Sequence, residues 1–165
     1  MKLALLQARN VLGNTKDNPA VGCVIVKDNT IISAASTSIS GRPHAEQNAI
    51  NYLKKNIKGS DIYVTLEPCS HYGKTAPCVN AIIKHKIKKV FFSLKDPDKR
   101  SYNKSKIQFI KNKIKVKNDI LTSETKNFYK SYFKYKKESE LPYLAAKIAI
   151  SRDFYTRSVK KKWIT

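Results

Sequence analysis

Three side chains in two short segments of the chain could bind one metal ion together. They are His44, which follows Pro43, and the cysteines Cys69 and Cys78, which are separated by eight residues. One imidazole and two thiolates supply three protein ligands to a tetrahedral zinc ion and leave the fourth position for water, as a catalytic site requires. Magnesium and calcium prefer oxygen donors. The sequence therefore predicts a zinc cofactor held by these three residues.

Glu46 stands two residues after His44, in the first turn of the same predicted helix. At that spacing its carboxylate can face the cavity beside the metal without being a ligand. A carboxylate there can take a proton from water, protonate a ring nitrogen and deliver a proton to departing ammonia. Zinc deaminases divide the work in this way, with a His-x-Glu pair, a Pro-Cys pair and a further Cys. We therefore expect Glu46 to be catalytic.

Neither of the two segments predicts a metal site by itself. A His-Ala-Glu triplet usually begins a surface helix, and two cysteines are often only buried thiols. Together they stand at predicted strand-to-helix junctions, where ligands converge at the end of a sheet. Two other candidates fit structural roles better. Cys23 lies within a predicted buried strand, and His85 lies near a helix end, where the helix dipole favours it on the surface.

The periodicity of apolar residues predicts helices that alternate with strands after an initial β-hairpin. The predicted helices cover residues 2–12, 44–56, 77–85, 105–112 and 122–137. The predicted strands cover residues 21–27, 31–36, 62–66, 90–94, 114–116 and 142–150. This order predicts an α/β fold, a three-layer α-β-α sandwich with a central mixed sheet.

The composition suits one basic domain. The chain has 165 residues, 41% of them apolar, which is enough for one core and too short for two full domains. A net charge of +21 suggests nucleic acid or an anionic surface as a partner. However, residues 1–80 carry nine basic and five acidic side chains, whereas residues 81–165 carry 24 and seven, and the excess is nearly all lysine. Because scattered lysine is more typical of a solvated surface than of a phosphate reader, we do not expect a nucleic-acid partner.

The chain shows no membrane or export signal. No apolar run approaches the roughly 20 residues that span a bilayer, and the first residues become polar too soon for a secretory signal. Three cysteines, an odd number, argue against a disulfide framework. We expect a cytoplasmic protein with no membrane partner.

Three longer segments make a family resemblance specific. They are NPAVGCVIV at residues 18–26, GRPHAE at residues 41–46, and YVTLEPCSHYGKT at residues 63–75, which Pro77 and Cys78 follow closely. The chain resembles the diaminohydroxyphosphoribosylaminopyrimidine deaminases of riboflavin biosynthesis, the deaminase half of a bifunctional deaminase/reductase in the cytidine-deaminase-like superfamily. The eight residues between the cysteines match this family, whereas tRNA adenosine deaminases and guanine deaminases have a Cys-x-x-Cys version.

The resemblance implies a cytidine-deaminase-like fold and a zinc-dependent hydrolase. The reaction would remove the C2 amino group of a phosphoribosylated diaminopyrimidinone, giving the aminouracil ribosylamino phosphate and ammonia. His71 and Lys74, in the loop between the cysteines, would reach the ring and the phosphate, for which lysine is a good point-charge partner. Asn18 and Asp96 match substrate-contacting residues of the family. Members of the family associate, so the resemblance also implies a homo-oligomer of unstated size.

The sequence departs from the family pattern at three residues. Asp98 stands where Asn is usual, and Ala76 stands where the first Pro of a Thr-Pro-Pro-Cys string is usual. Both changes affect substrate contacts and not the metal. Phe154 stands where Gly is usual in the reductase.

Two domains of unequal size are expected. Residues 1–138 would form the zinc-dependent deaminase domain, and residues 139–165 the truncated start of a reductase-like domain, because residues 141–151 and 163–165 resemble the opening of the family's reductase. A nucleotide-binding βαβ unit takes about 30 residues and a whole domain several times more. We therefore expect no NADPH site here and a reductase that is supplied separately.

Two other functions agree with these features. One is a zinc deaminase that acts on the bases of RNA, and the other is a basic RNA-binding module with a structural zinc ion. A structural site needs a fourth Cys or His ligand, for which His71 is the only candidate. The ligand set of the metal therefore distinguishes catalysis from a structural role.

Overall fold

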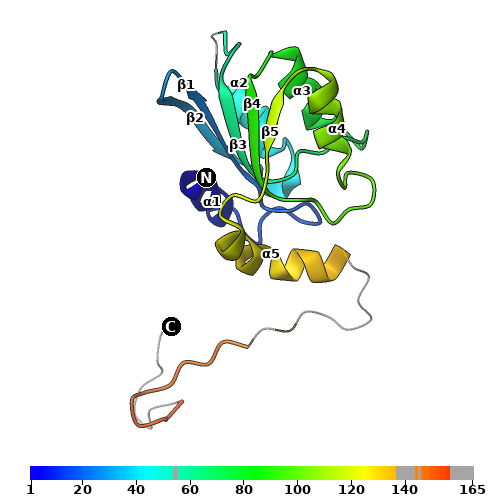
Figure 1. The fold of residues 1–165 in the computed structure, drawn as a ribbon. Helices are drawn as coiled ribbons and strands as arrows, with labels where there is room; N and C mark the ends of the chain where they lie inside the picture. The colour runs from blue at the N-terminus through cyan, green and yellow to red at the C-terminus, as the bar shows by residue number, and fades with distance from the viewer. Residues whose placement is uncertain (54–55, 137–143, 145, 157–165) are drawn as a thin grey trace.

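A five-stranded mixed sheet forms the centre of the molecule, with the strand order β2-β1-β3-β4-β5 (Figure 1). The computed structural model describes residues 1–53, 56–136, 144 and 146–156. The strands are β1 (Gly22–Lys27), β2 (Thr30–Ser36), β3 (Asp61–Leu66), β4 (Lys89–Leu94) and β5 (Lys115–Lys117). The helices are α1 (Lys2–Arg9), α2 (Ala45–Asn51), α3 (Cys78–Lys84), α4 (Lys104–Lys111) and α5 (Thr122–Lys136), with a short 3-10 turn at Ile39–Gly41.

The sheet lies between two layers of helices. Strand β1 pairs antiparallel with both β2 and β3, whereas β3, β4 and β5 run parallel. Parallel neighbours need crossover connections, which α3 and α4 provide. Helices α2, α3 and α4 cover one face of the sheet, and α1 and α5 lie against the other (Figure 1). The predicted α/β fold with a central mixed sheet is therefore confirmed.

The β1–β2 hairpin forms where the sequence predicts it. Its two turn residues, Asp28 and Asn29, both have positive φ angles, which is typical of a tight turn that matches the twist of the strands. Asp and Asn tolerate this conformation better than most residues. Helix α1 approaches β1 so closely that a Cβ atom at Gly22 would lie 1.8 Å from the carbonyl oxygen of Ala4. A side chain at that position would push the helix away from the sheet.

Four chain segments meet at one edge of the sheet because of this topology. Parallel strands β3 and β4 both end there, with Leu66 and Leu94 paired in register. Since β1 is antiparallel to β3, β1 begins at the same edge, and Gly22 pairs with Ser36, the last residue of β2. The segments before β1 and after β2, β3 and β4 therefore lie together. These four segments contain all the predicted site residues.

Tyr129 ties α5 to this edge. Its hydroxyl donates a hydrogen bond to the carbonyl oxygen of Ala20 at 2.9 Å and lies 2.6 Å from the hydroxyl oxygen of Thr65. Thr65 Oγ1 accepts in turn from the backbone N–H of Gly22. Because the tyrosine proton goes to Ala20, Thr65 is the donor to Tyr129. A continuous chain of buried hydrogen bonds thus joins β1, β3 and α5.

Two helices end earlier than predicted. Helix α1 ends at Arg9 instead of residue 12, and α2 ends at Asn51 instead of residue 56. Leu12 and Tyr52, which would extend them, are 57% and 68% exposed. Because short helices depend on burying an apolar face, neither helix gains from continuing.

The strand predicted at residues 142–150 is wrong for its described part. Residues 144 and 146–150 form no strand, and Ile148 and Ile150 are exposed. An apolar run forms a strand only when a neighbouring strand and a core accept it, and no strand of the described residues pairs with this segment. The described residues do not include the remainder of this segment, the boundary predicted at residue 138, or residues 157–165.

None of the helices of the described residues is long and apolar enough to cross a membrane.

Replacing Tyr129 by Phe tests the link between α5 and the sheet. The variant leaves the buried carbonyl of Ala20 without its donor, which typically costs about 1–3 kcal/mol. We expect a lower midpoint of urea unfolding for Tyr129→Phe. Tyr135→Phe on the same helix is the control, because Tyr135 is exposed, and it should unfold like the unaltered chain. Equal midpoints for the two variants would contradict the role of Tyr129.

Candidate metal centre and substrate pocket

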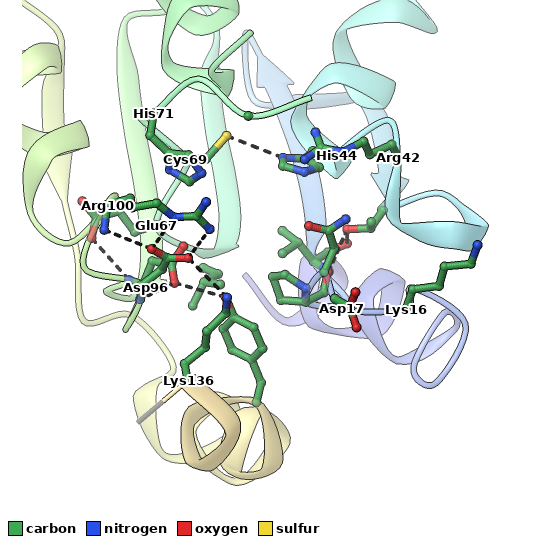
Figure 2. Close-up of a pocket in the computed structure, with 18 of the residues that line it drawn as sticks. Lys16, Asp17, Arg42, His44, Glu67, Cys69, His71, Asp96, Arg100 and Lys136 are labelled. Atoms are coloured by element: carbon green, nitrogen blue, oxygen red, sulfur yellow. Dashed lines mark hydrogen bonds and ion pairs between the residues drawn. The ribbon is translucent and has the colours of Figure 1, made fainter. Parts of the chain in front are cut away.

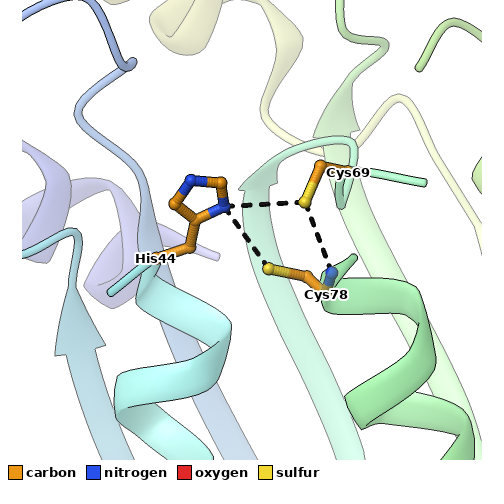
Figure 3. Close-up of side chains that lie close together, drawn as sticks. All are labelled: His44, Cys69 and Cys78. Carbon is orange, nitrogen blue, oxygen red and sulfur yellow. Dashed lines mark hydrogen bonds between the residues drawn. The ribbon is translucent and has the colours of Figure 1, made fainter. Parts of the chain in front are cut away.

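The three predicted metal ligands come from separate segments at the edge where the strands end. His44 is the N-cap residue of α2, Cys69 lies in the loop after β3, and Cys78 is the first residue of α3. Helices α2 and α3 pack against each other on one face of the sheet. Their first residues therefore lie side by side, and the imidazole and the two thiols point toward one another (Figure 3).

The distances within this group fit one zinc ion. His44 Nδ1 lies 3.6 Å from Cys69 Sγ and 3.4 Å from Cys78 Sγ. With bonds of about 2.1 Å to nitrogen and about 2.3 Å to sulfur at a tetrahedral angle, a nitrogen and a sulfur ligand of one zinc ion lie about 3.6 Å apart. All three ligand atoms lie within 4.8 Å of one another, and the described residues contain no second such group of His, Cys, Asp or Glu side chains. Both the donor types and their spacing suit zinc.

The two thiols influence each other's ionisation. A hydrogen bond from Cys78, together with one from His44, lowers the pKa of Cys69 to about 4 although burial opposes this. The same contact with Cys69, followed by burial, raises the pKa of Cys78. The pair therefore holds one thiolate, the form of cysteine that binds zinc, beside the imidazole.

The two residues that the sequence assigned to structural roles lie outside this group. Cys23 is fully buried in β1, and burial raises the pKa of its thiol. His85 is exposed at the C-terminal end of α3. Both predictions agree with the positions of these residues.

Glu46 lies beside the ligands and is not one of them. It sits in the first turn of α2 and is 3% exposed. Burial, and after it the nearby thiolate of Cys69, raises the pKa of Glu46 to about 7. A carboxyl group with that pKa can both accept and release a proton near neutral pH.

A pocket of about 590 Å³ is lined by His44, Glu46 and Cys69. Figure 2 shows two facing walls. One wall carries His71, Cys69, Arg100, Glu67 and Asp96, and the other carries His44, Arg42, Asp17 and Lys16. Lys136 of α5 reaches into the pocket from below (Figure 2).

All four predicted substrate-contacting residues line this pocket. Asn18 precedes β1, and its side-chain amide donates a hydrogen bond to the carbonyl oxygen of Gly41 at 3.2 Å. Asp96 follows β4 and is 6% exposed. Burial raises the pKa of Asp96 to about 6, although its carboxylate accepts hydrogen bonds from the backbone of Asp98 and the hydroxyl of Tyr132.

The other two predicted contacts lie on the loop between the cysteines. The Nδ1 atom of His71 lies 2.8 Å from the hydroxyl oxygen of Ser101, which joins this loop to the segment after β4. Burial, and next the charge of Arg100, lowers the pKa of His71. Lys74 is exposed on the same loop and lines the pocket.

Glu67 holds these segments together, although the sequence analysis did not single it out. Its buried carboxylate accepts backbone hydrogen bonds from Asp96 at 3.3 Å and Asn103 at 3.2 Å, and one from the hydroxyl of Ser105 at 2.6 Å. Burying a carboxylate costs free energy, which such hydrogen bonds offset. A carboxylate directly after a buried strand, two residues before Cys69, was the signal that could have identified it.

Asp98, one of the departures from the family pattern, is paired with cations. Its carboxylate accepts two hydrogen bonds from the guanidinium of Arg100, at 2.9 and 2.6 Å, and forms an ion pair with Lys136 at 3.3 Å. These contacts hold the pKa of Asp98 well below its usual range. Helix α5 thus supplies Lys136 and Tyr132 to the pocket. No sequence pattern distinguishes Lys136 from the other lysines of that helix.

Comparison with known proteins agrees with this geometry. The family described as "Cytidine and deoxycytidylate deaminase zinc-binding region" matches residues 1–94. A crystal structure of a diaminohydroxyphosphoribosylaminopyrimidine deaminase and 5-amino-6-(5-phosphoribosylamino)uracil reductase from Thermotoga maritima is 37% identical, with a TM-score of 0.79 over 84% of this chain and 40% of that chain. The predicted cytidine-deaminase-like fold is therefore confirmed.

Two curated relatives differ in length. The riboflavin biosynthesis protein RibD of Bacillus amyloliquefaciens is 39% identical over 100% of this chain, which spans only 45% of that protein. The diaminohydroxyphosphoribosylamino-pyrimidine deaminase of Buchnera aphidicola subsp. Acyrthosiphon pisum is 42% identical over 73% of this chain and 82% of that protein. The predicted family resemblance is therefore confirmed.

Removing either cysteine ligand should release the metal. We expect Cys69→Ala and Cys78→Ala to lose bound zinc and to unfold at lower temperature, because zinc binding and folding are coupled. Cys23→Ala is the matched control, since Cys23 is buried but lies outside the ligand group, and it should keep its zinc. Elemental analysis of the purified variants measures the difference. Full zinc content in either ligand variant would contradict the ligand set.

Proposed function

The chain belongs to the cytidine and deoxycytidylate deaminase family, within the branch of riboflavin-biosynthesis deaminases, and from this premise we propose its reaction. It removes the C2 amino group of a phosphoribosylated diaminopyrimidinone by hydrolysis, giving the aminouracil ribosylamino phosphate and ammonia. The observation that carries the proposal is the buried Glu46 beside the group of His44, Cys69 and Cys78, in a pocket that also holds cationic side chains.

Zinc is the cofactor in this proposal, held by His44 Nδ1 and the two sulfur atoms. The family description names a zinc-binding region, and the spacing of the three ligand atoms suits that ion. When bound, zinc acts as a Lewis acid that makes water acidic enough to be a nucleophile at neutral pH.

Glu46 carries the protons of the reaction. A C–O bond forms between C2 and the water oxygen, and the C–N bond to the amino group breaks. The carboxylate takes a proton from the water and passes it to the adjacent ring nitrogen. It then moves a proton from the added hydroxyl to the amino group, which leaves as ammonia. A pKa of about 7 suits a group that must accept and release a proton in each cycle.

The three candidate ligands would leave the fourth position of a bound zinc ion open, which supports catalysis. His71, the only candidate for a fourth ligand, has its Nδ1 atom beside Ser101 and does not belong to the ligand group. Catalytic zinc sites keep one position free, whereas structural sites fill all four. This favours an enzyme over an RNA-binding module with structural zinc.

The remaining pocket residues recognise the substrate in this proposal. The ring, the ribose and the phosphate are contacted by four residues, Asn18, His71, Lys74 and Asp96. This assignment is supported by their positions, because all four line the same pocket as Glu46 although they come from three separate segments. Lys74 is the residue proposed for the phosphate, since lysine binds phosphate as a point charge.

We also propose that residues 1–138 are the deaminase domain and that residues 139–165 begin a reductase-like domain. The Buchnera deaminase aligns over 120 residues, whereas the longer Bacillus protein aligns over the whole chain. The complete reaction sequence would then need a reductase.

The direct test is incubation of the zinc-loaded chain with the diaminopyrimidinone ribosylamino phosphate, with detection of ammonia. An RNA substrate is assayed in parallel. Ammonia from the small substrate is expected. Ammonia from the RNA alone would favour the alternative of a base deaminase that acts on RNA.

Replacing Glu46 by Gln should abolish most turnover and leave the metal bound. General acid–base catalysis contributes about 10² to 10⁴ in rate, and an amide cannot carry the proton. We expect kcat to fall by that factor while zinc content stays unchanged. Glu124→Gln, on the exposed face of α5, is the control and should retain activity. A Glu46→Gln variant as fast as the unaltered chain would exclude this residue from the mechanism.

Replacing Lys74 by Ala should weaken binding of the phosphorylated substrate. If Lys74 contacts the phosphate equally in the ground and transition states, KM rises and kcat changes little. Lys58→Ala is the control, because Lys58 is exposed and lies outside the pocket. The assay is repeated with the dephosphorylated substrate, on which Lys74→Ala should have no effect. An equal effect on both substrates would contradict the assignment.

A further inference from the structure

The loop that carries Lys74 has little support of its own. Residues 72–76 are exposed, and one backbone hydrogen bond, from Gly73 N to the carbonyl oxygen of Thr75 at 3.3 Å, lies within this stretch. The side chain of Asn80, in helix α3, donates a hydrogen bond to the hydroxyl of Tyr72 at 3.2 Å. These contacts do not fix the distance between Lys74 and the opposite wall.

Arg42 reaches this loop from the opposite wall. It lies in the segment between β2 and α2, and its Nη1 donates a hydrogen bond to Thr75 Oγ1 at 2.6 Å. A Cβ atom at Gly73 would lie 3.4 Å from Nη2, so the guanidinium also lies against the loop. Among the described residues, no other hydrogen bond joins residues 72–76 to that wall.

We propose that Arg42 is a positioning residue, which holds the loop across the pocket through Thr75 so that Lys74 meets the phosphate of the substrate. The inference rests on the proposed function, because Lys74 is assigned to the phosphate there. It adds a residue that acts through Lys74 and touches neither the ring nor the metal.

The physical reason is the entropy of an exposed loop. Ordering each residue costs free energy, and a loop that is not held in advance must be ordered when the substrate binds. Losing the contact therefore raises KM and leaves kcat nearly unchanged. Arginine suits the role because its planar guanidinium can donate to Thr75 while it lies on the backbone of Gly73. Lysine has no such planar fork.

The kinetic test uses a double-mutant cycle on the zinc-loaded chain. Arg42→Ala and Thr75→Val should each raise KM for the phosphorylated substrate about three- to tenfold, with kcat within about twofold. The double variant should match the single variants, because both remove the same hydrogen bond. Arg42→Lys should resemble Arg42→Ala. The control is Arg9→Ala, an exposed arginine of α1, which should leave KM unchanged.

A second measurement distinguishes positioning from direct contact with the phosphate. In a Lys74→Ala background, Arg42→Ala should raise KM no further, because its effect passes through Lys74. A further rise in that background, or an effect of Arg42→Ala much larger than that of Thr75→Val, would mean that Arg42 binds the phosphate itself. Either result would overturn the proposal.

Hydrogen exchange tests the loop without any substrate. We expect the amides of residues 70–76 to exchange about threefold faster or more in Arg42→Ala and in Thr75→Val than in the unaltered chain and in Arg9→Ala. Unchanged exchange in both variants would overturn the proposal even if KM rises. If the unaltered chain releases no ammonia from the diaminopyrimidinone, the proposed function fails, while this measurement still decides whether Arg42 holds the loop.

Discussion

The meeting of four chain segments at one edge of the sheet is the constraint on which the candidate site depends. It requires β1 to run antiparallel to β3 and β4 to run parallel to it. If β1 ran the other way, Asn18 would lie at the far edge, away from Cys69. The buried hydrogen bonds from Gly22 to Thr65 and from Thr65 to Tyr129 hold this arrangement in the interior. The sheet topology thus decides which residues can share a pocket.

The carboxylates of the pocket differ because their surroundings differ. Glu67 accepts three hydrogen bonds and holds the segment after β4. Asp98 is paired with two cations and stays ionised. Glu46 and Asp96 are buried, and burial raises the pKa of both. Carboxyl groups in one pocket therefore differ in pKa, because their environments and partners differ.

Helix α5 extends the site beyond the segment that the family description matches. That match ends at residue 94, whereas Tyr132 and Lys136 lie in the pocket and contact Asp96 and Asp98. Some of the excess positive charge of residues 81–165 therefore lies in the pocket, and not only on the solvated surface. Since Arg100 and Lys136 both pair with Asp98, the carboxylate at this departure from the family pattern has cationic partners.

The sequence by itself predicted the candidate metal ligands and determined the order of the elements. His44, Glu46, Cys69 and Cys78 were identifiable because ligand type and local spacing are properties of short segments, and apolar periodicity likewise predicted the five strands of the sheet. Only the tertiary structure decided where α1 and α2 end, because burial of distant surfaces sets those limits.

The tertiary structure also decided which partners the remaining pocket residues have. Three sets of contacts join segments that are far apart in the chain. They are the hydrogen bonds to Glu67, the ion pair between Lys136 and Asp98, and the hydrogen bond between Arg42 and Thr75. No local pattern records such pairs. They arise because strands that are distant in sequence are neighbours in the sheet, so their loops must meet at the same edge.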